Sequence, residues 1–139
     1  MNINIADGSN YFKGLLLLIS MDRKISELEI QLMKRVGKSL GFEKEFCDTA
    51  ISEILDNTHI EQTPPKFTRK EVATKFVKDG FAIAYADSEA HPTEVDWLKS
   101  TVEHNGLELE WFYKEREQAS QTNSSLSRME VDGITVQYS

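Results

Sequence analysis

Residues 12–42 read FKGLLLLISMDRKISELEIQLMKRVGKSLGF, and this stretch decides the fold. The run Phe12–Ile19 is apolar on nearly every side of a helix, so it predicts a central helix over about 11–21. After an acidic turn, apolar residues recur at every fourth position and predict an amphipathic helix over about 27–40: Leu28, Leu32, Val36 and Leu40. Gly41 followed by Phe42 is typical of a left-handed glycine that ends a helix.

The same order of elements recurs 65 residues downstream. Identical residues occupy helix ends, helix starts and glycine stops in both halves: Lys13 and Lys78, Asp22 and Asp87, Glu29 and Glu94, Lys34 and Lys99, Gly41 and Gly106. Further helices are predicted over about 44–56, 68–86, 92–105 and 107–118. Two such units would bury their first helices against each other with approximate two-fold symmetry. The sequence therefore predicts an all-α fold, a compact bundle of about six helices from a duplicated three-helix unit.

Two local signals precede the fourth predicted helix. Residues 57–67 contain Pro64-Pro65 and no periodicity, so they are expected to form the main internal connection. Thr68 and Glu71 have the Thr-x-x-Glu spacing of a capping box. This spacing predicts that Thr68 caps the fourth helix.

The end of the chain differs in composition from the rest. We assign residues 1–118 to the helical domain and residues 119–139 to a polar linker and C-terminal tail, because 121–127 are polar and Ser-rich. Within the tail, Met129–Val136 predicts two short strands around an Asp132-Gly133 turn. An isolated hairpin is marginal in water. The tail is therefore expected to dock on the helices, to pair with another chain or to stay mobile, and the sequence leaves all three open.

Composition narrows the classes of partner. The chain has 23 acidic and 16 basic side chains, for a formal charge of −7. This balance opposes binding to nucleic acids or anionic membranes, which depends on Lys and Arg neutralising phosphates. The longest apolar run, Leu15 to Ile19, is too short to span a bilayer, so no membrane insertion is expected. With Cys47 as its one cysteine the chain can form no internal disulfide, and a cytoplasmic location is the expectation.

Four carboxylates form the candidate metal site: Asp22, Glu29, Asp87 and Glu94. If the two halves pack with two-fold symmetry, their acidic turns converge, and carboxylate oxygens are the ligands that Ca²⁺ and Mg²⁺ prefer. The alternative is helix capping. Ser26 and Glu29 have capping-box spacing, and Glu94 stands at the same position after His91. An EF-hand is excluded, because the twelfth loop position is Met33 in one half and Leu98 in the other.

Signatures of catalysis are missing from the sequence. It has no Gly-rich phosphate loop, no Gly-x-Ser-x-Gly elbow and no Cys/His nucleophile arrangement. The three histidines, His59, His91 and His104, are too scattered to predict a zinc site. We therefore expect no enzyme, no catalytic residues and no organic cofactor.

The repeated turn resembles a known family. DRKISELE at 22–29 and DSEAHPTE at 87–94 are similar to the Ala-Asp-Gly-x-Ile-x-x-x-Glu-like turn that the tellurite-resistance TerB family carries twice. The similarity spans roughly 11–112 and extends to helical relatives such as the N-terminal region of a DnaJ-like membrane co-chaperone. The glycine after each Asp is Arg23 and Ser88 here, and Met21 stands in place of alanine. The resemblance implies a compact helical fold, a cytoplasmic stress-associated or scaffold-like role and an acidic cluster suspected of binding metal, with no established reaction.

These observations lead to one main hypothesis and two alternatives. The main hypothesis is a non-enzymatic TerB-like module that binds a partner protein or a divalent cation, Ca²⁺ or Mg²⁺, through an acidic surface between its two halves. The first alternative is a structural or oligomerisation domain whose tail docks on a second copy. The second is a small metal-dependent hydrolase that uses the same carboxylates.

Overall fold

The computed structural model describes residues 1–21, 25–56, 61–86, 91–121 and 129–138. Within these ranges the chain forms six α-helices: α1 (Ile5–Ser20), α2 (Glu27–Ser39), α3 (Lys44–Asp56), α4 (Lys70–Ala84), α5 (Pro92–His104) and α6 (Leu109–Gln121). A 3-10 turn, η2 (Glu130–Gly133), and two short strands, β1 (Asn2–Ile3) and β2 (Thr135–Val136), complete the described structure. The predicted all-α bundle is confirmed. None of the described helices is long and apolar enough to cross a membrane.

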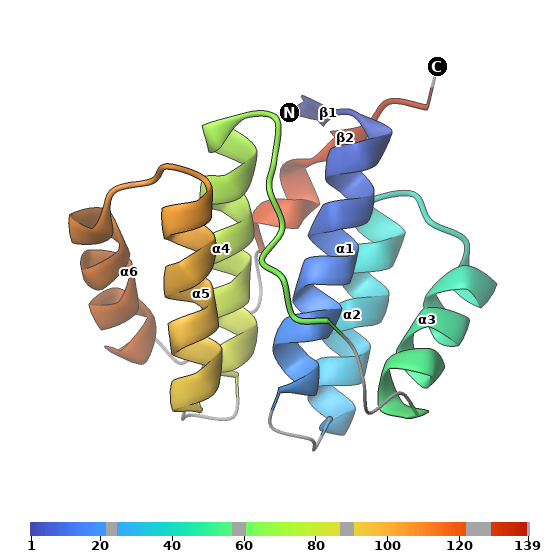
Figure 1. The fold of residues 1–139 in the computed structure, drawn as a ribbon. Helices are drawn as coiled ribbons and strands as arrows, with labels where there is room; N and C mark the ends of the chain where they lie inside the picture. Colours follow the sequence, from blue (N-terminus) through green and yellow to red (C-terminus); the bar gives the residue numbers. More distant parts are fainter. Residues whose placement is uncertain (22–24, 57–60, 87–90, 122–128, 139) are drawn as a thin grey trace.

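The helices are arranged as two three-helix halves around a central pair. Figure 1 shows α1 and α4 side by side and running in the same direction, with α2 and α3 beside α1 and with α5 and α6 beside α4. Gly41 and Gly106 end the second helix of each half with φ of 80° and 69°, the left-handed conformation that glycine adopts without strain. The duplication predicted from the sequence therefore appears in the arrangement of the helices and in their stop signals.

The hydrophobic core is continuous across the two halves. The residues of α1 and α4 that face the seam are fully buried, because both helices are surrounded by neighbours: Tyr11, Leu15, Leu18, Phe76, Val77 and Phe81. The Phe76 ring stands edge-on to Tyr11 at 5.4 Å between centroids and also contacts Phe67 and Trp97. This aromatic cluster joins α1, the connection before α4, α4 itself and α5 into one core.

Gly37 sets how closely α2 and α3 pack, and this closeness can be tested. A Cβ at Gly37 would lie 2.2 Å from the sulfur of Cys47 and 3.2 Å from the ring of Phe12. We expect Gly37→Ala to lower the free energy of unfolding by about 1–3 kcal/mol, because overpacking displaces these neighbours. The double variant Gly37→Ala/Cys47→Ala removes the closest atom, the sulfur of Cys47. In denaturant titrations it should therefore lose less free energy of unfolding than the two single variants lose in sum. Strict additivity of the two changes would contradict the close packing.

The start of α4 differs from the prediction. Thr68 does not cap it: the helix begins at Lys70, its N-cap is Arg69, and no side chain caps it there. Thr68 instead turns to α1, where its hydroxyl donates to Asp7 at 2.5 Å and its N–H donates to the same carboxylate at 3.0 Å. The capping-box prediction was wrong because a buried carboxylate from the other half binds the threonine.

The first helix also begins earlier than the apolar pattern indicated. Asn4 caps α1 by accepting the N–H of Asp7 at 2.7 Å, and the helix runs from Ile5. The polar side chain of Asp7 is only 1% exposed, so the polar side of the first turn of α1 is buried against the rest of the molecule. Apolar periodicity cannot show burial of this kind.

The C-terminal tail does not form the predicted hairpin. The Asp132-Gly133 pair lies inside the turn η2, and the strand that follows, β2, pairs in parallel with β1 at the other end of the chain. The Asp132 carboxylate accepts the N–H of Met129 at 3.0 Å, so it closes the 3-10 turn rather than a two-residue hairpin loop. Of the three alternatives for the tail, the structure shows docking on the helices. The helix α6 continues to Gln121, three residues beyond the limit of 118 assigned to the helical domain.

Candidate functional site

The two glutamates of the predicted metal site act as helix caps. The Glu29 carboxylate accepts the N–H of Ser26 at 2.9 Å, and the Ser26 hydroxyl accepts the N–H of Glu29 at 3.1 Å. In the other half the Glu94 carboxylate accepts the N–H of His91 at 3.2 Å, and the His91 ring accepts from Thr93. Both glutamates are 4% exposed. The capping alternative is thus confirmed for Glu29 and Glu94.

The two aspartates of that site, Asp22 and Asp87, lie outside the described residues. The helices that the two glutamates begin, α2 and α5, start at the same end of the molecule (Figure 1). In the part of the chain that the structure describes, no group of three or more His, Cys, Asp and Glu side chains is placed to hold a metal ion. A Ca²⁺ or Mg²⁺ site on Asp22, Glu29, Asp87 and Glu94 stays a prediction.

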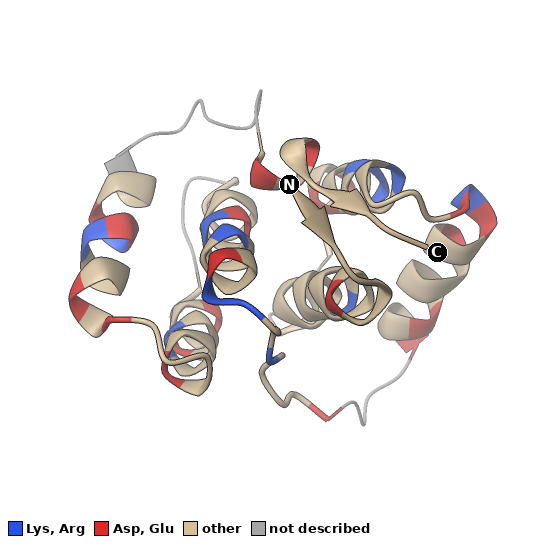
Figure 2. Cartoon of the chain, turned by 90° about the horizontal axis from the view of Figure 1, so that it is seen from above, with Lys and Arg blue, Asp and Glu red and all other residues tan. Residues whose placement is uncertain are grey.

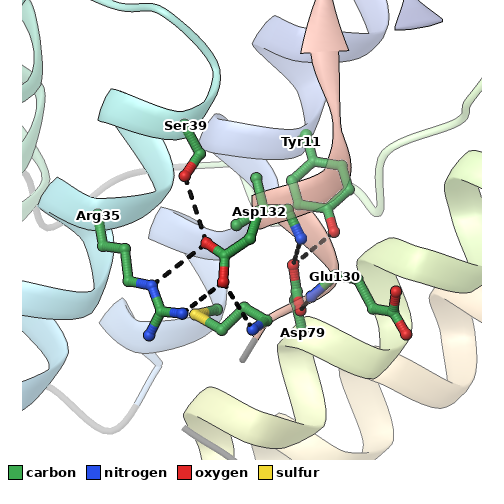
Figure 3. A network of polar contacts seen from close by, with 8 residues as sticks. Tyr11, Arg35, Ser39, Asp79, Glu130 and Asp132 are labelled. Carbon is green, nitrogen blue, oxygen red and sulfur yellow. Dashed lines mark hydrogen bonds and ion pairs between the residues drawn. The ribbon is translucent and has the colours of Figure 1, made fainter. Parts of the chain in front are cut away.

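A different carboxylate, Asp79 of α4, is the centre of a buried polar cluster. Asp79 is 1% exposed, and three donors surround it. The Tyr11 hydroxyl donates to Oδ2 at 2.6 Å, the N–H of Val131 donates to the same oxygen at 2.9 Å, and the N–H of Glu130 donates to Oδ1 at 2.7 Å (Figure 3). One side chain in the middle of α4 thus holds both a residue of α1 and the 3-10 turn η2.

Burial and hydrogen bonding act in opposite directions on this carboxyl group. Burial raises the pKa of Asp79 from 3.8 to about 6, although the bonds from Tyr11, Glu130 and Val131 oppose the rise. The pKa of the Tyr11 hydroxyl is raised well above its usual value, because it is buried and faces Asp79. Asp79 therefore changes charge near pH 6, well above the range of an exposed aspartate.

Two groups of charges surround the buried cluster. On one side the Arg35 guanidinium of α2 forms an ion pair with Asp132, and the Ser39 hydroxyl donates to the same carboxylate at 3.4 Å (Figure 3). The hydrogen bond from Arg35 lowers the pKa of Asp132. On the other side Lys75 and Lys78 of α4 lie 3.2 Å and 3.9 Å from Glu130. This protein of net negative charge therefore presents basic side chains to an acidic segment.

Apolar and main-chain contacts hold the rest of the segment. Four apolar side chains are at most 7% exposed: Met129, Val131, Ile134 and Val136. The N–H of Thr135 donates to the Met1 carbonyl at 2.8 Å and the N–H of Gln137 donates to the Ile3 carbonyl at 2.9 Å, which makes the parallel pair β1–β2. Figure 2 looks down on these terminal strands. We call residues 129–138 the C-terminal segment, and Tyr11, Arg35, Ser39, Lys75 and Asp79 the C-terminal seat.

The C-terminal segment occupies the same place in the second half as the internal connection does in the first. The connection 61–67 crosses one face of the seam between α1 and α4, and the C-terminal segment crosses the opposite face (Figure 1). By the 65-residue repeat, Asp79 corresponds to Gly14 and Glu130 corresponds to Pro65. A Cβ at Gly14 would lie 3.1 Å from Pro65. In the first half Pro65, which has no N–H, packs against Gly14, which has no side chain. At the corresponding place in the second half, the N–H of Glu130 donates to the carboxylate of Asp79.

The two crossing segments also bind the opposite half of the molecule. The connection is held at the C-cap of α5, where Asn105 accepts the N–H of Phe67 at 2.9 Å and donates to the Pro65 carbonyl at 2.8 Å. The C-terminal segment is held by α2 through Arg35 and Ser39. Each half therefore ends in a segment that fastens it to the other half.

Sequence reasoning missed this site, although a signal for it was present. Val72, Phe76 and Ile83 lie on one face of α4, and Asp79 falls between them at helical spacing. A carboxylate on an apolar face is rarely buried without partners. The pattern could have pointed to Asp79, but it could not show which donors meet it.

Comparison of the chain with protein-family models, curated proteins and solved structures gives no match.

Proposed function

We propose that this chain is a non-enzymatic protein-binding module that holds a segment of a partner protein across the seam between its two halves, at the C-terminal seat. The observation that carries the proposal is the binding of the chain's own C-terminal segment by Asp79, through two main-chain N–H groups that any peptide possesses. A segment held by main-chain hydrogen bonds, with pockets for its alternate side chains, is one of the recurring ways in which a protein binds a peptide.

The chemistry of the seat suggests what such a segment would look like. Arg35, Lys75 and Lys78 face carboxylates, and the apolar residues of the segment alternate with the acidic Glu130 and Asp132. A suitable partner segment would therefore alternate apolar and acidic residues and begin a 3-10 turn. The seat is basic, so this proposal replaces the acidic surface of the main hypothesis with a basic one at the same seam.

The TerB-like assignment remains part of the proposal. Its support is the repeated order of an apolar helix, a capped amphipathic helix with a glycine stop and a third helix. The stress-associated role is an expectation that comes with that resemblance alone. In the cation hypothesis, Glu29 and Glu94 would have to bind the ion while each of their carboxylates also accepts a main-chain N–H.

Addition of a free peptide to the full-length protein tests the proposal. Val131→Asp places a second carboxylate beside Asp79 at a position with 0% exposure, so it should unseat the C-terminal segment without altering a residue of the seat. A fluorescent peptide of residues 129–138 should then bind this variant saturably, as measured by anisotropy. The same peptide with Val131→Asp is the matched control and should not bind. Absence of binding to a folded Val131→Asp protein would overturn the proposal.

A second form of the experiment covers the case in which Val131→Asp does not fold. A protease site built into positions 123–127 lets the C-terminal segment be cut from the folded wild-type bundle and remain bound. Labelled peptide should then replace the cut segment at a rate that rises when Arg35 is changed to Ala, because the ion pair with Asp132 is lost. A cut segment that never exchanges, or a peptide that never binds after the segment has left, would contradict the proposal.

A further inference from the structure

We propose that the C-terminal seat accepts the C-terminal segment of a second copy of this chain, so that two chains form a dimer by exchanging residues 129–138. This inference rests on the proposed function, because exchange needs a seat that binds the segment in trans. It adds the identity of the partner. The segment whose fit to the seat is seen is the chain's own, and an identical copy supplies the same side chains and main-chain groups.

Every contact that holds the described part of the segment is non-covalent and independent of which chain supplies it. Among these contacts are the hydrogen bonds to Asp79, the ion pairs with Arg35 and Lys75, the β1–β2 pairing and the bond from the Tyr138 hydroxyl to the Leu40 carbonyl at 2.8 Å. Exchange of identical elements between copies preserves such contacts, and it costs little beyond the entropy of association. An exchanged dimer would therefore have two filled seats.

The repeat explains why this segment can exchange and the internal connection cannot. The two segments cross equivalent faces of the seam, but the connection leads directly into α4 and cannot leave without moving that helix. The C-terminal segment follows residues 122–128, whose sequence TNSSLSR has a linker composition. Of the two equivalent crossing segments, the C-terminal segment is therefore the one that can be exchanged with a second chain.

Exchange competes with binding within one chain. Within one chain the seven residues 122–128 join α6 to the segment, and a tether of this length keeps the segment at an effective concentration on the order of millimolar, so the closed monomer dominates in dilute protein. The exchanged dimer should instead dominate over the closed monomer when the tether is too short for the segment to reach the seat of its own chain. The helix α6 packs on α4 and α5, and Figure 1 shows α4 between α6 and η2. Deletion of 123–127 leaves two residues between Gln121 and Met129, a reach of about 10 Å, which is no more than about one helix diameter.

The experiment is therefore a deletion of residues 123–127 in the full-length protein. Light scattering should show a folded dimer, and the amides of Glu130 and Val131 should remain protected from hydrogen exchange. Replacement of 123–127 by five Gly and Ser residues is the matched control, and it should leave the protein as monomeric as the wild type at the same concentration. Adding Asp79→Ala to the deletion should return it to a monomer. A folded deletion variant that is monomeric overturns the inference, as does a dimer that survives Asp79→Ala.

A measurement on the wild type covers a deletion variant that fails to fold. Isotope-labelled and unlabelled chains mixed at about 1 mM, where the tether no longer outcompetes a second chain, should give mixed dimers by native mass spectrometry, whereas Asp79→Ala chains should not. Absence of mixed dimers would overturn the inference. If the free peptide binds the Val131→Asp protein but no exchanged dimer forms, the exchange fails and the protein-binding proposal stands. If the peptide does not bind, both fail.

Discussion

Replacement of Asp79 by alanine is expected to lower the free energy of unfolding by about 3–5 kcal/mol, because it leaves the buried N–H groups of Glu130 and Val131 and the Tyr11 hydroxyl without their acceptor. The loss should appear first at the chain terminus. Limited proteolysis should cut the C-terminal segment of Asp79→Ala under conditions in which it stays intact in the wild type. Denaturant titrations followed by circular dichroism give the change in free energy.

A matched control separates this effect from the loss of a negative charge. Asp96 lies exposed on α5, so Asp96→Ala removes the same carboxylate from a helix surface and should change stability by less than about 0.5 kcal/mol. If Asp79→Ala were no more destabilised than Asp96→Ala, or lost stability while its terminal segment stayed protected, then Asp79 would not be what holds the segment.

The contribution of Asp79 to the stability of the wild type should also fall as the pH rises from about 4 to about 7. The pKa of Asp79 is about 6 in the folded protein against 3.8 for the free side chain, so between these values the folded state keeps a proton that the unfolded chain has released. The contribution of this group is therefore fully present below pH 3.8 and is lost as the pH rises through 6. A difference of about two pKa units corresponds to about 3 kcal/mol.

Asp79→Asn isolates this dependence from that of the other ionisable groups. The amide does not titrate, so the stability of the wild type minus that of Asp79→Asn should decrease by about 2.5 kcal/mol between pH 4 and pH 7. The charges that face the site, on Glu130, Asp132, Lys75 and Lys78, are present in both proteins and cancel in the difference. A difference that is flat or rises with pH would contradict the raised pKa of Asp79.

Hydrophobic periodicity predicted most of the fold because the two halves repeat it. Apolar spacing placed all six helices, and the limits Lys44–Asp56 of α3 agree with the structure. The glycine stops and the capping residues Ser26 and Glu29 were also identified, since each has a local signature of a few residues. These features depend on contacts within one helix or one turn, and a single sequence records such contacts directly.

The candidate site depends on contacts that no local pattern records. Asp7 binds Thr68 and Asp79 binds Glu130, pairs separated by 61 and 51 residues. The Asp132-Gly133 pair has the local signature of a hairpin turn, yet the parallel pairing of β2 with β1 and the ion pair with Arg35 favour a 3-10 turn. Tertiary contacts thus overrode a correct reading of local preference. The 65-residue repeat aligns Pro65 of the connection with Glu130, but it records neither the donors of Asp79 nor the turn of the C-terminal segment.

The central claim is that the C-terminal segment leaves its seat while the helical bundle stays folded. Native-state hydrogen exchange tests it within one sample of wild-type protein, because both faces of the seam carry amides bonded to a side chain. We predict that the amides of Glu130 and Val131 open with a lower free energy than the Phe67 amide, which Asn105 holds on the opposite face, and than the global unfolding value. Equal protection of all three amides at the global value would show that the segment is a fixed part of the core, and would contradict the account.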